Sequence, residues 1–290
     1  MAPLLSLPIA AATFAVGALV GRGLGGLLRK MANDGGFASS RYYSMARGLA
    51  ASLPAVGHWF APRGTRCSRL ALLEFLCGFA ALASWELFPA GKALCGAVFL
   101  ITLIGAFFID LDHMIIPDLF TIGLAVIGLL LCLLCPSLHD FGSLTVLHSL
   151  RSLAAGLLGL AIGSATVLWF GLIGETLLSR EVMGFGDVKF VGAIGVFCGW
   201  QGALFALFGG AVLGAITLIV GRIGAALSGR RSSLLLESPA SARENGRVGV
   251  SQPFPFGPML ATAAALYFLG FHSGVDAFFA PYQALFAKNF

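Results

Sequence analysis

The sequence predicts an all-α integral membrane protein, a polytopic helical bundle with about eight transmembrane helices. Hydrophobic residues make up 58% of the 290 residues, and the mean hydropathy is +0.92. Only 11% of the residues are charged, against about 25% in an ordinary soluble domain. The apolar runs are long and lack the alternation of barrel strands, so they indicate helices.

Runs of about 20 apolar residues predict where the chain crosses the membrane. The predicted spans lie near residues 4–28, 70–88, 93–109, 119–135, 152–174, 187–200, 202–221 and 255–272. No Lys- or Arg-led segment precedes the first run, which favours a spanning helix over a cleaved secretory signal. The stretch Val188–Arg222 is too long for one span, and its Gly-flanked Trp200 indicates a tight helical hairpin.

The basic residues predict the orientation, because short cytoplasmic loops carry an excess of Lys and Arg. Of the 18 basic residues, 15 fall on one side of the predicted spans, leaving only Lys92, Arg151 and Lys288 for the other. Both termini are therefore expected outside, and the loops that carry Asp110 and Asp187 are expected in the cytoplasm. The net charge of +5 follows from this excess of Lys and Arg on one side, and attraction of these residues to anionic membrane lipid explains it. No nucleic-acid partner is therefore predicted.

Two larger segments lie outside the predicted spans. Residues 29–69 form a basic loop that follows the first helix, and residues 1–69 together are predicted as an N-terminal unit. Residues 70–290 are predicted as the membrane-embedded domain, with a flexible Ser-, Arg- and Gly-rich loop near 223–254. The six cysteines fall mostly in apolar runs and are expected to pack as small hydrophobic side chains, without a disulfide framework.

Carboxylates cluster in "FFIDLDHMIIPD", residues 107–118. A long apolar run leads directly into Asp110, and a carboxylate at membrane depth costs about 2.5–3.5 kcal/mol, so such a residue is expected to be functional. Asp112 is expected in a solvated turn. Asp118 follows Pro117 and stands where a helix N-cap would be, which favours a capping carboxylate.

A second candidate site is "MGFGDVKF", residues 183–190. Gly184 and Gly186 lack a Cβ, so the backbone before Asp187 can approach a neighbouring helix or an extended peptide closely. Lys189 is expected to extend toward the lipid headgroups.

Asp110 and Asp187 each stand at the cytoplasmic end of a predicted span, which suggests a pair. Two carboxyl groups within a few ångströms share a proton and titrate together. One can then act as general base on a water while the other acts as general acid toward a peptide carbonyl. From the residue types alone, a proton-coupled transporter that uses the same carboxylates is equally admissible.

Three motifs in order resemble the type IV prepilin peptidase family of membrane aspartic proteases, whose second motif is GxGD. They are "FIDLDHMIIPDLFT", "MGFGDVKFVGAIGVFCGW" and "PFPFGPMLATAA", and the resemblance covers about residues 70–272. It implies that Asp110 and Asp187 are the catalytic pair, while Asp112 and Asp118 occupy recurrent positions outside that pair. Gly184, Gly186, Lys189 and Pro117 are then expected to shape the site or to bind substrate.

The resemblance also implies a substrate and a location. The expected reaction is removal of a short basic leader from type IV prepilins, or from type II secretion pseudopilins, at the cytoplasmic face of the bacterial inner membrane. Such substrates present Gly before the cut, Phe after it and Glu at the fifth mature position, and Lys189 or a loop arginine is a candidate partner for that Glu. Proteolysis by paired carboxylates needs no metal or cofactor.

The N-terminal part departs from the family pattern. Many members carry a G-S-F-L-N-like segment and two CxxC pairs that bind zinc, and they methylate the new N-terminus with S-adenosylmethionine. Here Arg22–Gly25 replaces S-F-L-N, and the loop 29–69 holds only Cys67, so it lacks the four thiolates of such a site. Methylation is therefore left open, with a homologue that lacks methyltransferase activity, or is impaired in activity, as the alternative.

Overall fold

The structure is a computed structural model of the chain, and it describes residues 7–34, 65–142, 144–179, 183–227 and 255–289. Every regular element in these ranges is a helix, and no strand occurs among them. The predicted all-α fold is confirmed.

The described helices include two π-helices and one 3-10 turn. In chain order they are α1 (Leu7–Asp34), α3 (Thr65–Leu87), α4 (Ala90–His113), the π-helix η1 (Leu119–Gly123), α5 (Leu124–Leu134), the 3-10 turn η2 (Pro136–His139), α6 (Val146–Leu178), α7 (Phe185–Leu227), α9 (Gly257–Leu266), the π-helix η3 (Tyr267–Phe271) and α10 (His272–Asn289). Five stretches of the described helices are long and apolar enough to cross a membrane: Pro8–Leu28, Ala90–His113, Val146–Leu178, Phe185–Gly221 and Gly257–Ala280. The chain is thus a multi-pass membrane protein by its helices, while the count of eight spans stays a prediction.

Several helices are longer than the sequence predicts. α1 and α3 extend into the predicted loop 29–69, and α7 continues through residues 223–227, which were predicted as part of a flexible loop. The rest of both predicted loops, 35–64 and 228–254, lies outside the described residues. The expectation that Asp112 lies in a turn is wrong, because α4 continues to His113 before the left-handed Met114 ends it. α10 was not predicted.

α7 is broken at Gly199, whose φ of 68° and ψ of 179° are not helical. A positive φ of this size suits glycine, which has no Cβ to clash with the backbone. On either side of the break, the Val191 carbonyl and the Ala203 Cβ both lie beside Gly163 of α6. The two halves of α7 therefore fold back on each other at Gly199, as the Gly-flanked Trp200 predicts, while the division into separate membrane spans 187–200 and 202–221 stays a prediction.

Glycines let α6 and α7 approach closely. Gly159 of α6 and Gly195 of α7 face each other so tightly that a Cβ on either would overlap the backbone of the other. Small residues at such crossings are the usual basis of helix packing in membranes. Elsewhere the core is aromatic: Phe99 of α4 stacks on Phe197 of α7 at 4.8 Å between ring centroids and contacts Phe268 of η3 at 5.4 Å.

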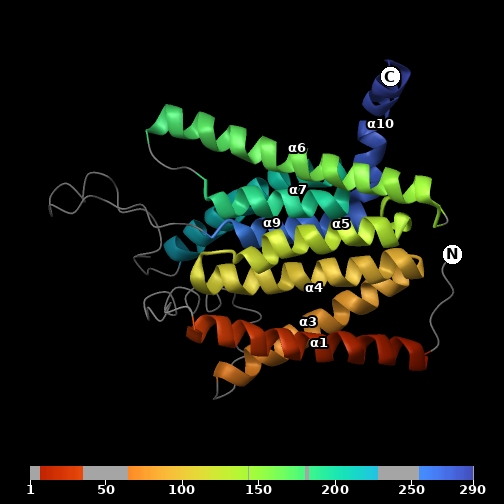
Figure 1. Cartoon of the computed structure of the whole chain (residues 1–290). Helices are drawn as coiled ribbons and strands as arrows, with labels where there is room; N and C mark the ends of the chain where they lie inside the picture. Colours follow the sequence, from red (N-terminus) through yellow and green to blue (C-terminus); the bar gives the residue numbers. More distant parts are fainter. Residues whose placement is uncertain (1–6, 35–64, 143, 180–182, 228–254, 290) are drawn as a thin grey trace.

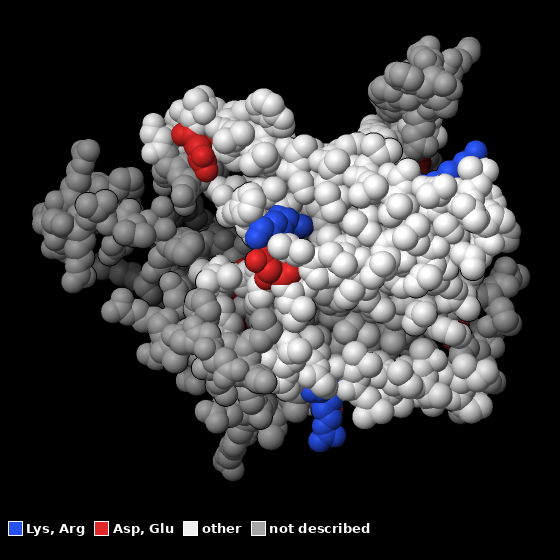
Figure 2. Space-filling view, viewed as in Figure 1, with Lys and Arg blue, Asp and Glu red and all other residues white. Residues whose placement is uncertain are grey.

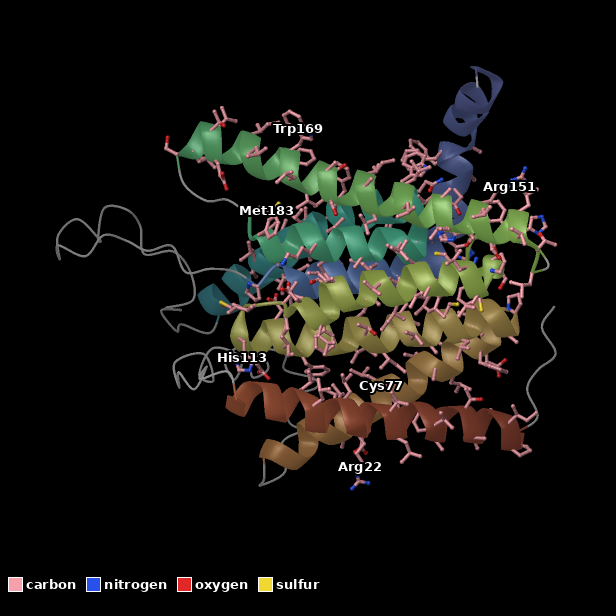
Figure 3. The ribbon with its side chains drawn as sticks, in the orientation of Figure 1. Arg22, Cys77, His113, Arg151, Trp169 and Met183 are labelled. Carbon is pink, nitrogen blue, oxygen red and sulfur yellow. The ribbon has the colours of Figure 1, made fainter. Side chains whose placement is uncertain are left out.

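The long helices run roughly side by side, with α1 and α3 along one edge and α10 leaving the bundle (Figure 1). Figure 3 shows His113 and Met183 toward one end of this bundle and Arg151 toward the other. We call the end where α4 finishes and α7 begins the aspartate end. The face seen in Figure 2 carries few charged groups on its described surface, as expected where lipid surrounds a protein.

Candidate active site

Asp110 lies in the last turn of α4 at the aspartate end. It is only 5% exposed, which is unusual for a carboxylate. Its Oδ2 accepts a hydrogen bond from the backbone N–H of Gly257, the first residue of α9, at 3.1 Å. Because the first N–H groups of a helix have no partner within the helix, this bond satisfies a donor of α9 while it holds the Asp110 carboxylate in place.

Gly257 leaves no space beside Asp110 for a side chain. A Cβ at this position would lie 2.7 Å from Oδ2 of Asp110 and 2.9 Å from Cδ1 of Ile116. Sequence reasoning did not include Gly257 among the site residues, although it belongs to the "PFGP" segment of the third motif. The signal was a glycine at the start of an apolar helix, and only the fold brings it to α4.

Asp187 lies in the first turn of α7 and is half-buried. Its backbone N–H donates to the Gly184 carbonyl at 3.0 Å, which forms the turn that leads into the helix. A Cβ at Gly184 would lie 3.7 Å from Oδ2 of Asp187. The carboxylate is therefore folded back along the glycine-containing segment that precedes it, where a helix N-terminus favours negative charge.

The structure brings Asp110 and Asp187 together at the aspartate end. Ile116 lies between their segments, since its side chain meets Gly257 on one side and comes within 4.0 Å of the position of a Cβ on Gly186. The two carboxylates are close enough for the charge of Asp110 to act directly on Asp187. Residues 77 positions apart in the sequence thus form one site, built from α4, α7 and the start of α9.

Lys189 and Asp118 form an ion pair beside this site. Lys189 Nζ lies 2.7 Å from Asp118 Oδ1 and 5.1 Å from the centre of the Phe185 ring. The expected capping role of Asp118 is wrong, because its side chain makes no capping hydrogen bond to η1. Lys189 likewise turns to Asp118, so the pair connects the start of α7 to the segment that follows α4.

The remaining predicted site residues surround the two carboxylates without touching both. Pro117 lies two residues before η1, and its carbonyl accepts a hydrogen bond from the Phe120 N–H at 2.9 Å. Asp112 is half-buried and lies two residues after Asp110, so it projects from a different face of α4. A Cβ built on Gly184 or Gly186 would make only ordinary contacts, at 3.7 Å to Oδ2 of Asp187 and at 4.0 Å to Cβ of Ile116. Neither glycine is therefore at a tight contact between described helices.

Two further ion pairs join charged groups of the described residues: Lys92 with Asp140 at 2.7 Å, and Arg22 with Glu74. Arg22 of α1 points away from the bundle and pairs with Glu74 of α3 at 3.7 Å (Figure 3). Among the described residues, no group of three or more His, Cys, Asp or Glu side chains is arranged to hold a metal ion. Residues 35–64 of the loop 29–69 lie outside the described residues, and so does the side chain of Cys67 in α3.

Fold and site together define a polytopic α-helical membrane protein with two aspartates at one end of its bundle. Residues 97–219, which include both aspartates, match the type IV leader peptidase family. This match confirms the resemblance read from the three motifs.

Similar proteins carry the same family name. A prepilin leader peptidase/N-methyltransferase of Xanthomonas campestris pv. campestris is 30% identical over 211 residues, which cover 71% of this chain and 61% of the relative. A protein of the same name from Burkholderia pseudomallei is 30% identical over 205 residues, 69% of this chain and 55% of the relative. One from Stutzerimonas stutzeri is 29% identical over 216 residues, which cover 71% of this chain and 62% of the relative. The chain therefore spans a little over half the length of these relatives. No solved structure matches it.

Proposed function

We propose that the chain is a membrane aspartic endopeptidase that removes the leader peptide of type IV prepilins or of type II secretion pseudopilins. The observation that carries the proposal is that two helices bring Asp110 and Asp187 near enough for the charge of one to act on the other, beside the glycines Gly184 and Gly186. The names of the relatives support a peptidase over the proton-coupled transporter that the residue types also allowed.

The two aspartates differ in their surroundings, which supports separate roles. Asp110 receives the Gly257 N–H, and a donor of this kind stabilises a carboxylate in its charged form. Asp110 is therefore the better general base: it takes a proton from a water, whose oxygen attacks the scissile carbonyl. Asp187 supplies the proton to the carbonyl oxygen. As the tetrahedral intermediate collapses, Asp110 passes its proton to the departing nitrogen and Asp187 takes one back from a hydroxyl of the intermediate, so the C–N bond breaks and the amine of the mature N-terminus is released. The chemistry needs only the two carboxyl groups and water.

The charge pattern supports cleavage at the cytoplasmic face of the bacterial inner membrane. Lys92 stands in the first turn of α4 and Arg151 in the second turn of α6, at the opposite end of the bundle from Asp110 and Asp187. Since basic residues concentrate in cytoplasmic loops, the 15 that fall in the other loops put the aspartate end inside. Membrane lipid surrounds the helices, and a prepilin with its own apolar helix reaches the site within the membrane.

The test is cleavage of a prepilin co-expressed with the chain in membranes. Asp110→Ala and Asp187→Ala are expected to abolish processing, while Asp112→Ala and Asp118→Ala retain it. The positive control is a known prepilin peptidase expressed in place of the chain. If that peptidase cuts the prepilin and the unaltered chain leaves it unprocessed, the proposal is refuted.

Mass spectrometry of the mature N-terminus extends the same experiment to the second activity in the relatives' names. A product about 14 Da heavier than the unmodified peptide would indicate methylation, which draws on S-adenosylmethionine. An unmodified product would identify the chain as a peptidase without that activity.

A further inference from the structure

A cavity of about 240 Å³ lies between the last turns of α6 and the start of α7. Its walls are mostly apolar and come from Val167, Leu168, Leu172, Met183, Phe185 and Val188, with Glu175 as the one acidic residue. The volume and the long apolar walls suit an extended aliphatic side chain.

The cavity adjoins the proposed catalytic site. Gly184 also lines the cavity. A Cβ built on Gly184 would lie 3.7 Å from Oδ2 of Asp187. Val188 is the next residue after Asp187 in the chain. A peptide whose scissile bond lies at Asp187 can therefore place a neighbouring side chain in this cavity.

Glu175 is in a place that disfavours a negative charge. It lies in the last turn of α6, where its carbonyl accepts the Ser179 N–H, and the negative end of the helix dipole repels a carboxylate. No hydrogen bond or ion pair joins its side chain to another described residue. Lys189, the nearest described lysine along α7, is held by Asp118. The Glu175 carboxylate thus lacks a cation within the described part of the chain.

We propose that this cavity is a substrate subsite that takes a lysine or arginine side chain from the residues flanking the scissile bond. The aliphatic stem lies along the apolar walls, and the charged head pairs with Glu175, as long basic side chains do when they cross apolar surface. The inference rests on the proposed peptidase function. It assigns to Glu175 a role in substrate selection, while Asp110 and Asp187 perform the chemistry.

The test uses the full chain in detergent and a set of prepilin-type peptides with one Gly–Phe cleavage site. Lys is placed at one flanking position at a time and compared with Met, which has a similar length and no charge. At one position the unaltered chain is expected to prefer Lys by roughly 10-fold in kcat/KM, the size of effect expected for a charged hydrogen bond. Glu175→Gln should cleave both peptides equally, and Glu175→Lys should prefer a Glu-containing peptide.

Glu74→Gln is the matched control, because Glu74 of α3 pairs with Arg22 of α1 and does not line the cavity. It should keep the preference for Lys. Equal cleavage of Lys and Met peptides at every position, or a preference that survives Glu175→Gln, would overturn the subsite and leave the cavity to another cation, such as a lipid ammonium group.

Binding separates this inference from the proposed function. Dissociation constants for the Lys and Met peptides are measured with the Asp187→Asn protein, with and without Glu175→Gln. If the unaltered chain does not cleave the peptides, the proposed peptidase function is refuted. The Lys preference in binding, and its loss in Glu175→Gln, would still decide whether the subsite exists.

Discussion

Gly257→Ala tests whether the close contact between α9 and Asp110 matters for activity. The added Cβ would stand 2.7 Å from Oδ2 of Asp110, while ordinary contacts begin near 3.4 Å, so the carboxylate has to retreat by about 0.7 Å. That movement also lengthens the 3.1 Å hydrogen bond from the Gly257 N–H. Misplacement of a reacting group by about 1 Å costs roughly 100-fold in rate, so we expect a 10- to 100-fold loss of kcat/KM.

The assay is cleavage of a purified prepilin by the solubilised protein, with thermal unfolding measured in parallel. Gly270→Ala is the matched control, because a Cβ there meets no atom within 4 Å. It should leave both the cleavage rate and the unfolding temperature close to those of the unaltered protein. Full activity of a folded Gly257→Ala protein would refute the reasoning that this glycine positions Asp110.

Three further predictions concern other parts of the chain. Asp118→Asn should lower the unfolding free energy by less than about 1 kcal/mol, because its pair with Lys189 is largely exposed; a larger loss in chemical unfolding would contradict this. Gly159→Ala should destabilise the protein by about 1–3 kcal/mol through overlap with α7, whereas Gly221→Ala, which meets open space, should not; equal unfolding temperatures would refute the close α6–α7 packing. Burial, together with the charge of Lys92, lowers the pKa of His139 to about 4 from 6.5. Below pH 6.5 His139 binds a proton in the unfolded chain but not in the folded one. Its contribution to the unfolding free energy is therefore fully present above pH 6.5 and falls by at most about 3 kcal/mol as the pH drops to 4. His139→Asn should flatten this pH dependence of unfolding, and an unchanged slope would contradict it.

The fold was predictable where hydrophobicity alone decides it. Long apolar runs identify spanning helices, and a Gly-flanked Trp200 identifies the hairpin in α7, because both features are local in the sequence. Helix ends were less predictable. Hydropathy marks where the apolar run ends at Ile109, whereas α4 continues through Asp112 and His113 to the left-handed Met114.

The site was predictable to the extent that its residues are chemically unusual. A carboxylate after a long apolar run is costly, which singled out Asp110, and the glycines before Asp187 marked the second motif. The partner of Asp118 was missed, because an N-cap and an ion pair with Lys189, 71 positions away, look the same in the local sequence. Gly257 was missed for the same reason: only tertiary packing sets its N–H against Asp110.

The most direct test of the central claim is a double-mutant cycle on the two aspartates. Cleavage rates are measured for Asp110→Asn, Asp187→Asn and the double variant, with folding confirmed by thermal unfolding. Groups that act as one unit lose activity non-additively, so each single change should reduce cleavage as far as both together. Substantial cleavage by either single variant, or losses that simply multiply in the double variant, would contradict a shared catalytic pair.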